Sequence, residues 1–81
     1  MNFNKGDTFV VNGFSDSCPV TFKDKIISMG IIDGQEMIVT SKSIFGGPIA
    51  FDTKCGMISL RKKDLKFLKL EKISLKVWLW T

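Results

Sequence analysis

A two-residue alternation of apolar and polar side chains, which recurs in short stretches along the chain, constrains the fold more than any other feature. This period is typical of strands that bury one face, and turn residues separate the stretches. It predicts strands over residues 8–14, 36–41, 49–53, 57–61 and 67–71, with a sixth segment over 73–79. Gly13 predicts a bend, and a change of phase at Glu71-Lys72 predicts a bulge or turn. Short antiparallel strands protect their edges by closing, so we expect one small, strongly bent barrel that is mainly β.

One segment has the period of a helix instead. Apolar side chains recur at helical spacing at Phe22, Ile26 and Met29. Thr21 and Asp24 resemble a capping box, and Gly30 suits the left-handed residue that ends a helix. We therefore expect one short α-helix inserted after the first strand. Residues 62–65 interrupt the later alternation and predict a single helical turn.

The composition argues against an enzyme. A chain of 81 residues allows a single small domain, in which a deep catalytic cleft is hard to build. The chain has no His, the side chain best suited to proton transfer near neutral pH, and its carboxylates are scattered among lysines. Its glycines form no phosphate-binding motif. We therefore predict no catalytic residue and no cofactor, with function on the outer surface.

The thiols and apolar stretches indicate compartment and metal use. Two cysteines without His do not complete the four-ligand shell of a structural zinc, so we predict no metal site. The first residues lack the apolar core of a signal peptide, and the stretch 26–32 is too short to span a bilayer. We expect a cytoplasmic protein with free, partly buried thiols and no direct membrane insertion. Three methionines are interpreted as core filling: Met29, Met37 and Met57.

The charge is unevenly distributed. The net charge of +4 comes from 12 basic and 8 acidic residues, and the basic excess lies in residues 61–81. Spread-out lysines are usually a solvated face, and we expect no nucleic-acid partner. A basic barrel that binds nucleic acid is kept as the main alternative.

Several stretches together resemble the FeoA family, the small cytosolic partners of the ferrous-iron membrane transporter FeoB. They are Gly13-Phe14, Ser28-Met29-Gly30-Ile31, Asp33-Gly34, the loop 43–49 and the stretch 58–64. The resemblance covers residues 7 to about 72. It implies an SH3-like barrel that performs no chemistry and docks on the cytosolic GTP-binding domain of the transporter to support iron uptake. Family members are also described as binding transition metals, so a metal-responsive regulator that uses Cys18 and Cys55 is a further alternative.

The resemblance and the loop positions suggest a contact surface for the partner. It combines the helix end with the glycine-flanked loop and comprises Met29, Gly30, Ile31, Ile44, Phe45, Gly46, Gly47 and Arg61. Phe45 has two interpretations: it folds back over a barrel end, or it is an exposed recognition contact.

The C-terminal segment differs from the rest of the chain. Residues 1–73 form the FeoA-like domain, and residues 74–81 are an apolar extension of the same domain beyond the usual family ending. An extended segment 74–81 would be apolar on both faces near Trp78 and Trp80, so something should cover it. Two outcomes are open: the segment adds a strand to the chain's own sheet, or it pairs with a second copy through these tryptophans or with the membrane partner.

Overall fold

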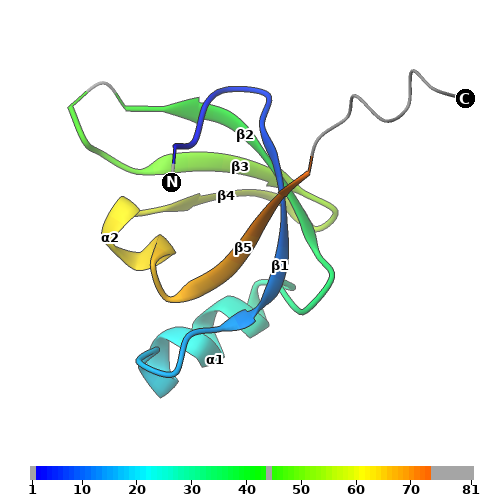
Figure 1. The fold of residues 1–81 in the computed structure, drawn as a ribbon, viewed down its shortest axis with the longest axis vertical. Coiled ribbons are helices and arrows are strands. Elements are labelled where there is room, and N and C mark those ends of the chain that lie inside the picture. The colour runs from blue at the N-terminus through cyan, green and yellow to red at the C-terminus, as the bar shows by residue number, and fades with distance from the viewer. Residues whose placement is uncertain (1, 44, 74–81) are drawn as a thin grey trace, which may run out of the picture.

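The computed structural model describes residues 2–43 and 45–73. In chain order its elements are β1 (Thr8–Phe14), α1 (Val20–Ser28), β2 (Glu36–Lys42), β3 (Ile49–Thr53), β4 (Gly56–Leu60), α2 (Lys62–Leu65) and β5 (Leu68–Ile73). The strands form one antiparallel sheet in the order β4-β3-β2-β1-β5. Figure 1 shows the sheet curling around a common interior, with α1 beneath one end and α2 between β4 and β5. The five expected strands, the inserted helix and the helical turn at 62–65 are therefore confirmed.

The interior is filled by the inward side of each strand together with one stripe of α1. Its buried residues are Phe3, Phe9, Val11, Ile26, Ile31, Met37, Val39, Ile49, Phe51, Leu60, Leu65 and Leu68. Phe3 precedes the first strand, yet its ring centroid lies 4.8 Å from that of Phe9 and 6.0 Å from that of Phe51. The N-terminal segment thus adds an aromatic side chain to the core, which the alternation did not predict.

The register irregularity predicted at Glu71-Lys72 is wrong in position. β5 pairs with β1 without interruption from Ile73 opposite Thr8 to Leu70 opposite Val11, and the register shifts only beyond Val11. The next pair is Phe14 opposite Leu68, so β1 advances by three residues while β5 advances by two. The extra residue therefore belongs to β1. Gly13 lies in this bulge with a φ of +105°, which confirms the bend expected at that position.

Met57 is not core filling. It pairs with Asp52 across the β3–β4 ladder and is 67% exposed, because the alternation of β4 sends Ile58 and Leu60 inward instead. Met37 is buried, and Met29 is half-buried against the core, as expected.

The predicted capping box is also wrong. α1 begins at Val20 with Pro19 as the N-cap residue, and no side chain caps it. Thr21 already lies inside the first turn, so its hydroxyl cannot occupy the N-cap position. Within the part of the chain that the structure describes, no helix is long and apolar enough to cross a membrane.

Candidate docking surface

The β3–β4 ladder brings the glycine-flanked loop next to the start of α2. Ile49 pairs with Leu60, so Pro48, which precedes β3, and Arg61, which follows β4, lie at the same end of the two strands. A hollow of about 670 Å³ lies there, lined by Gly46, Gly47, Pro48, Arg61, Lys62 and Lys63. We call these residues, together with Phe45, the loop–α2 surface.

Phe45 is the aromatic contact that this surface offers. Its side chain is 92% exposed, so it does not fold back over a barrel end. The Phe45 N–H donates a hydrogen bond to Ser43 Oγ at 3.4 Å. Gly47 approaches the same serine so closely that a Cβ there would lie 2.8 Å from Ser43 Oγ. The two glycines thus allow a tight loop that holds the ring in solvent.

The charge of the loop–α2 surface is positive. Arg61, Lys62 and Lys63 are all exposed. The ion pair found among residues 2–43 and 45–73 joins Lys72 Nζ to Asp7 Oδ2 at 3.6 Å, so none of the three cations is neutralised by a described carboxylate. The loop–α2 surface thus combines an exposed phenyl ring in the loop with three cations at the start of α2.

The helix end has a structural task. Ile31 N–H donates to Ile26 O at 3.2 Å and Gly30 N–H to Ile27 O at 2.9 Å, the two bonds of a Schellman motif. Gly30 has a φ of +85°, and a Cβ there would lie 2.6 Å from Cys55 Sγ. Ile31 is fully buried. These contacts explain the residues Met29-Gly30-Ile31 without a partner.

The structure divides the predicted contact surface into two parts. Gly46, Gly47 and Arg61 line one hollow, and Phe45 lies in the same loop. Met29, Gly30 and Ile31 lie at the other end of the sheet, beneath the β3–β4 turn that carries Cys55. Figure 1 shows the β2–β3 loop at the upper left and α1 at the bottom. The predicted contacts Ile44, Trp78 and Trp80 lie outside the described residues.

Three residues of the loop–α2 surface were not selected from the sequence: Pro48, Lys62 and Lys63. The basic excess after residue 60 indicated the two lysines, but their place beside the loop depends on the register of β3 and β4. The short connection between the expected strands 49–53 and 57–61 favours a hairpin with that register, so the signal was present.

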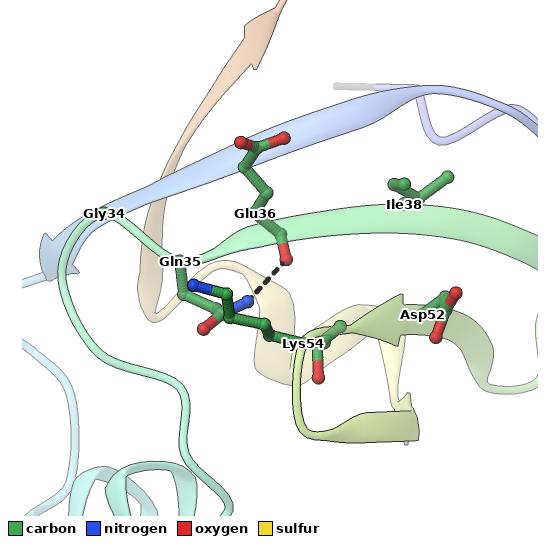
Figure 2. Close-up of a pocket in the computed structure, with 7 residues that line it drawn as sticks. Gly34, Gln35, Glu36, Ile38, Asp52 and Lys54 are labelled. Atoms are coloured by element: carbon green, nitrogen blue, oxygen red, sulfur yellow. Dashed lines mark hydrogen bonds between the residues drawn. The ribbon is translucent and has the colours of Figure 1, made fainter.

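A second depression lies on the outer face of β2 and β3 (Figure 2). Gln35 Nε2 donates to Glu36 O at 3.0 Å, and Figure 2 shows the Glu36 and Asp52 side chains on neighbouring strands, apart from each other. Among the residues that the structure describes, no three His, Cys, Asp or Glu side chains gather to hold a metal ion. Cys18 is half-buried before α1 and Cys55 is exposed in the β3–β4 turn, both as free thiols.

Solved structures share this fold. A FeoA-like protein from Clostridium acetobutylicum is 27% identical, with a TM-score of 0.76 over 90% of this chain and 83% of that one. A crystal structure of an iron uptake regulatory protein (FeoA) is 19% identical, with a TM-score of 0.71 over 89% and 90% of the two chains. A manganese-dependent transcriptional repressor in complex with manganese is 21% identical, with a TM-score of 0.74 over 86% of this chain and 33% of that one.

The last two similarities show the fold alone, and the SH3-like barrel expected from the sequence is confirmed. The FeoA domain model matches residues 1–72 of the 81. That match spans both helices and every described strand except the last residue of β5. The chain therefore belongs to the FeoA family.

Proposed function

We propose that this chain is a cytoplasmic accessory protein of ferrous iron transport that docks on the cytosolic GTP-binding domain of a FeoB-type transporter through its loop–α2 surface. Membership of the FeoA family supports the role in iron transport. The observation that carries the docking surface is Phe45, which is 92% exposed and directly precedes Gly46, a residue of the hollow that three cations line. Aromatic residues at such positions supply large contact area with little loss of conformational entropy.

The partner site has a complementary chemistry under this proposal. An apolar recess receives the Phe45 ring, and carboxylates on its border meet Arg61 and the two lysines. The charges mainly accelerate encounter, whereas the buried ring slows dissociation. The affinity therefore falls with added salt but does not vanish.

The proposal is tested by measuring how this chain binds the purified GTP-binding domain of the FeoB-type transporter from the same organism. Phe45→Ala is expected to weaken binding about tenfold, the typical loss for a central aromatic contact, and to leave the melting temperature unchanged. Arg61→Glu is expected to slow association more than it speeds dissociation. Met57→Ala is the matched control, since Met57 is an exposed apolar residue on a different strand surface.

The results that contradict the proposal are separable. Equal affinities of wild type and Phe45→Ala would remove the loop–α2 surface as the contact. Absence of any binding at low salt would remove the docking role itself. Steeply salt-dependent binding of an oligonucleotide in its place would favour the nucleic-acid alternative, for which the cluster of Arg61, Lys62 and Lys63 is the supporting observation.

A further inference from the structure

A hollow beside α1 gathers apolar side chains that the docking role does not use. It has a volume of about 650 Å³. Val20, Ile27 and Ile32 line it and are 71%, 43% and 56% exposed. They are half of the six large apolar side chains exposed in the described part of the chain. Single exposed apolar residues are ordinary, but a cluster around a concave surface marks an interaction site.

The local sequence explains why these side chains face solvent. Val20 and Ile27 are seven residues apart in α1 and so lie on one face, while Ile26 points into the core. Ile32 follows the Schellman motif, which buries Ile31 and leaves the next side chain outside. Phe14 and the half-buried Cys18 also line this surface, which we call the α1 hollow.

The charges at the α1 hollow are mainly negative. Asp16, Asp33 and Lys23 are the charged residues that line it. Lys23 Nζ lies 5.5 Å from the centroid of the Phe14 ring, so its charge is partly engaged there. The hollow therefore suits an apolar segment that carries a positive charge. Residues 75–80, Leu-Lys-Val-Trp-Leu-Trp, have this chemistry, and Lys76 is their only charged side chain.

The chain's own C-terminal segment is poorly placed to fill the hollow. β5 ends at Ile73 opposite Thr8, and Gly13 at the hollow lies five residues further along β1, about 17 Å away. Figure 1 shows the end of β5 far from α1. Trp78 is also only five residues beyond Ile73, and a chain reversal uses about two of them. Trp78 would stop short, and Trp80 would reach only the rim.

We propose that residues 75–80 of a second copy of this chain occupy the α1 hollow, with the two tryptophans against Val20, Ile27 and Ile32. Reciprocal exchange of two segments into two hollows closes the assembly as a symmetric dimer. This proposal does not depend on docking to the transporter, because the α1 hollow and the loop–α2 surface share no residue.

Tryptophan fluorescence tests it directly, because Trp78 and Trp80 are the only tryptophans and the chain has no tyrosine. For the full chain, we expect a dimer in sedimentation and a shift of emission to shorter wavelength as concentration rises. Ile27→Asp should raise the dimer dissociation constant at least about tenfold. Trp78→Ala with Trp80→Ala should do the same. Met57→Asp, an equally drastic change at an exposed site outside the hollow, should leave it unaltered.

Mixing the two disabled proteins gives the decisive result. Ile27→Asp retains the C-terminal segment, and the double Trp variant retains the hollow but has no tryptophan. Together they should form a 1:1 complex, with the emission shift restored in the Ile27→Asp chain. This complex should be weaker than the wild-type dimer, since only one of two contacts forms. If Ile27→Asp fails to fold, Val20→Asp takes its place at a more exposed position of the same hollow.

Three outcomes would overturn the proposal. A wild-type monomer whose emission is independent of concentration would show that the segment does not join two copies. A dimer that survives both Ile27→Asp and Val20→Asp would show that it docks elsewhere. Loss of transporter-domain binding in these variants, with self-association unchanged, would assign the hollow to the transporter instead.

Discussion

At the scale of single residues, Gly30 is constrained both by its backbone and by its neighbour. Its φ of +85° is unfavourable for any residue with a Cβ, and that Cβ would meet Cys55 Sγ. Gly30→Ala is therefore expected to lower the free energy of unfolding by about 1–2 kcal/mol from the backbone alone, and by more if the thiol cannot move aside. Urea denaturation measures the loss.

Gly34→Ala separates the two causes, because Gly34 has a φ of +88° and, apart from its chain neighbours, no described residue has an atom within 4 Å of a Cβ placed there. A larger loss for Gly30→Ala than for Gly34→Ala measures the contact with Cys55. Cys55→Ala should remove most of that excess, because it deletes the Sγ at 2.6 Å and leaves only the Cβ of residue 55 at 3.3 Å. Suppose that Gly30→Ala costs more than Gly34→Ala, but costs just as much in the Cys55→Ala background as in the wild type. The contact with the thiol would then not be the cause of the larger loss.

The sequence singled out the residues at the end of α1 and in the β2–β3 loop, but it did not always show whether each is structural or exposed. Gly30 was correctly placed at the end of a helix, because the helical period stops there. Ile31 was also expected to contact a partner, yet it lies in the core. A motif shows that residues belong together, whereas burial depends on how the chain turns after the helix. Phe45 was left open for the same reason, and its exposure excludes the interpretation in which it folds back over a barrel end.

At the scale of elements, α1 forms without a side-chain cap and is held by its buried face. Thr21→Ala is expected to change the free energy of unfolding by less than about 0.5 kcal/mol, whereas loss of a working cap costs about 1 kcal/mol. Ile26→Ala is expected to cost about 2–5 kcal/mol, because Ile26 is fully buried. Chemical denaturation measures the free energy of unfolding of both variants. A loss of about 1 kcal/mol or more for Thr21→Ala would show that Thr21 caps the helix after all.

The strands were predictable because the period of two is a direct consequence of burying one face. Their boundaries differ from the expected ones by a residue or two, as for β5, which runs over Leu68–Ile73. The position of the irregularity was not predictable from β5, because the extra residue lies on its neighbour β1. The candidate site needed this same pairwise information, since Arg61 joins the loop only through the β3–β4 register.

At the scale of the whole molecule, the barrel offers two surfaces at different ends. The loop–α2 surface is basic with one exposed aromatic ring, and the α1 hollow is apolar with an acidic rim. Under the two proposals, the opposite charge and the separate location of the surfaces suit two different partners. A dimer formed through the α1 hollow would leave both copies of the loop–α2 surface accessible.

This separation predicts that the two activities can be lost independently. Phe45→Ala is expected to weaken binding of the transporter's GTP-binding domain about tenfold while the dimer dissociation constant stays the same. Ile27→Asp is expected to show the reverse, and the double variant should show both losses without further change, since distant sites contribute additively. Sedimentation for the dimer and calorimetry for the complex, on the same four proteins, measure all values. If either single variant shifts both constants, the two contacts share residues or are coupled, and the proposed separation of the two surfaces is wrong.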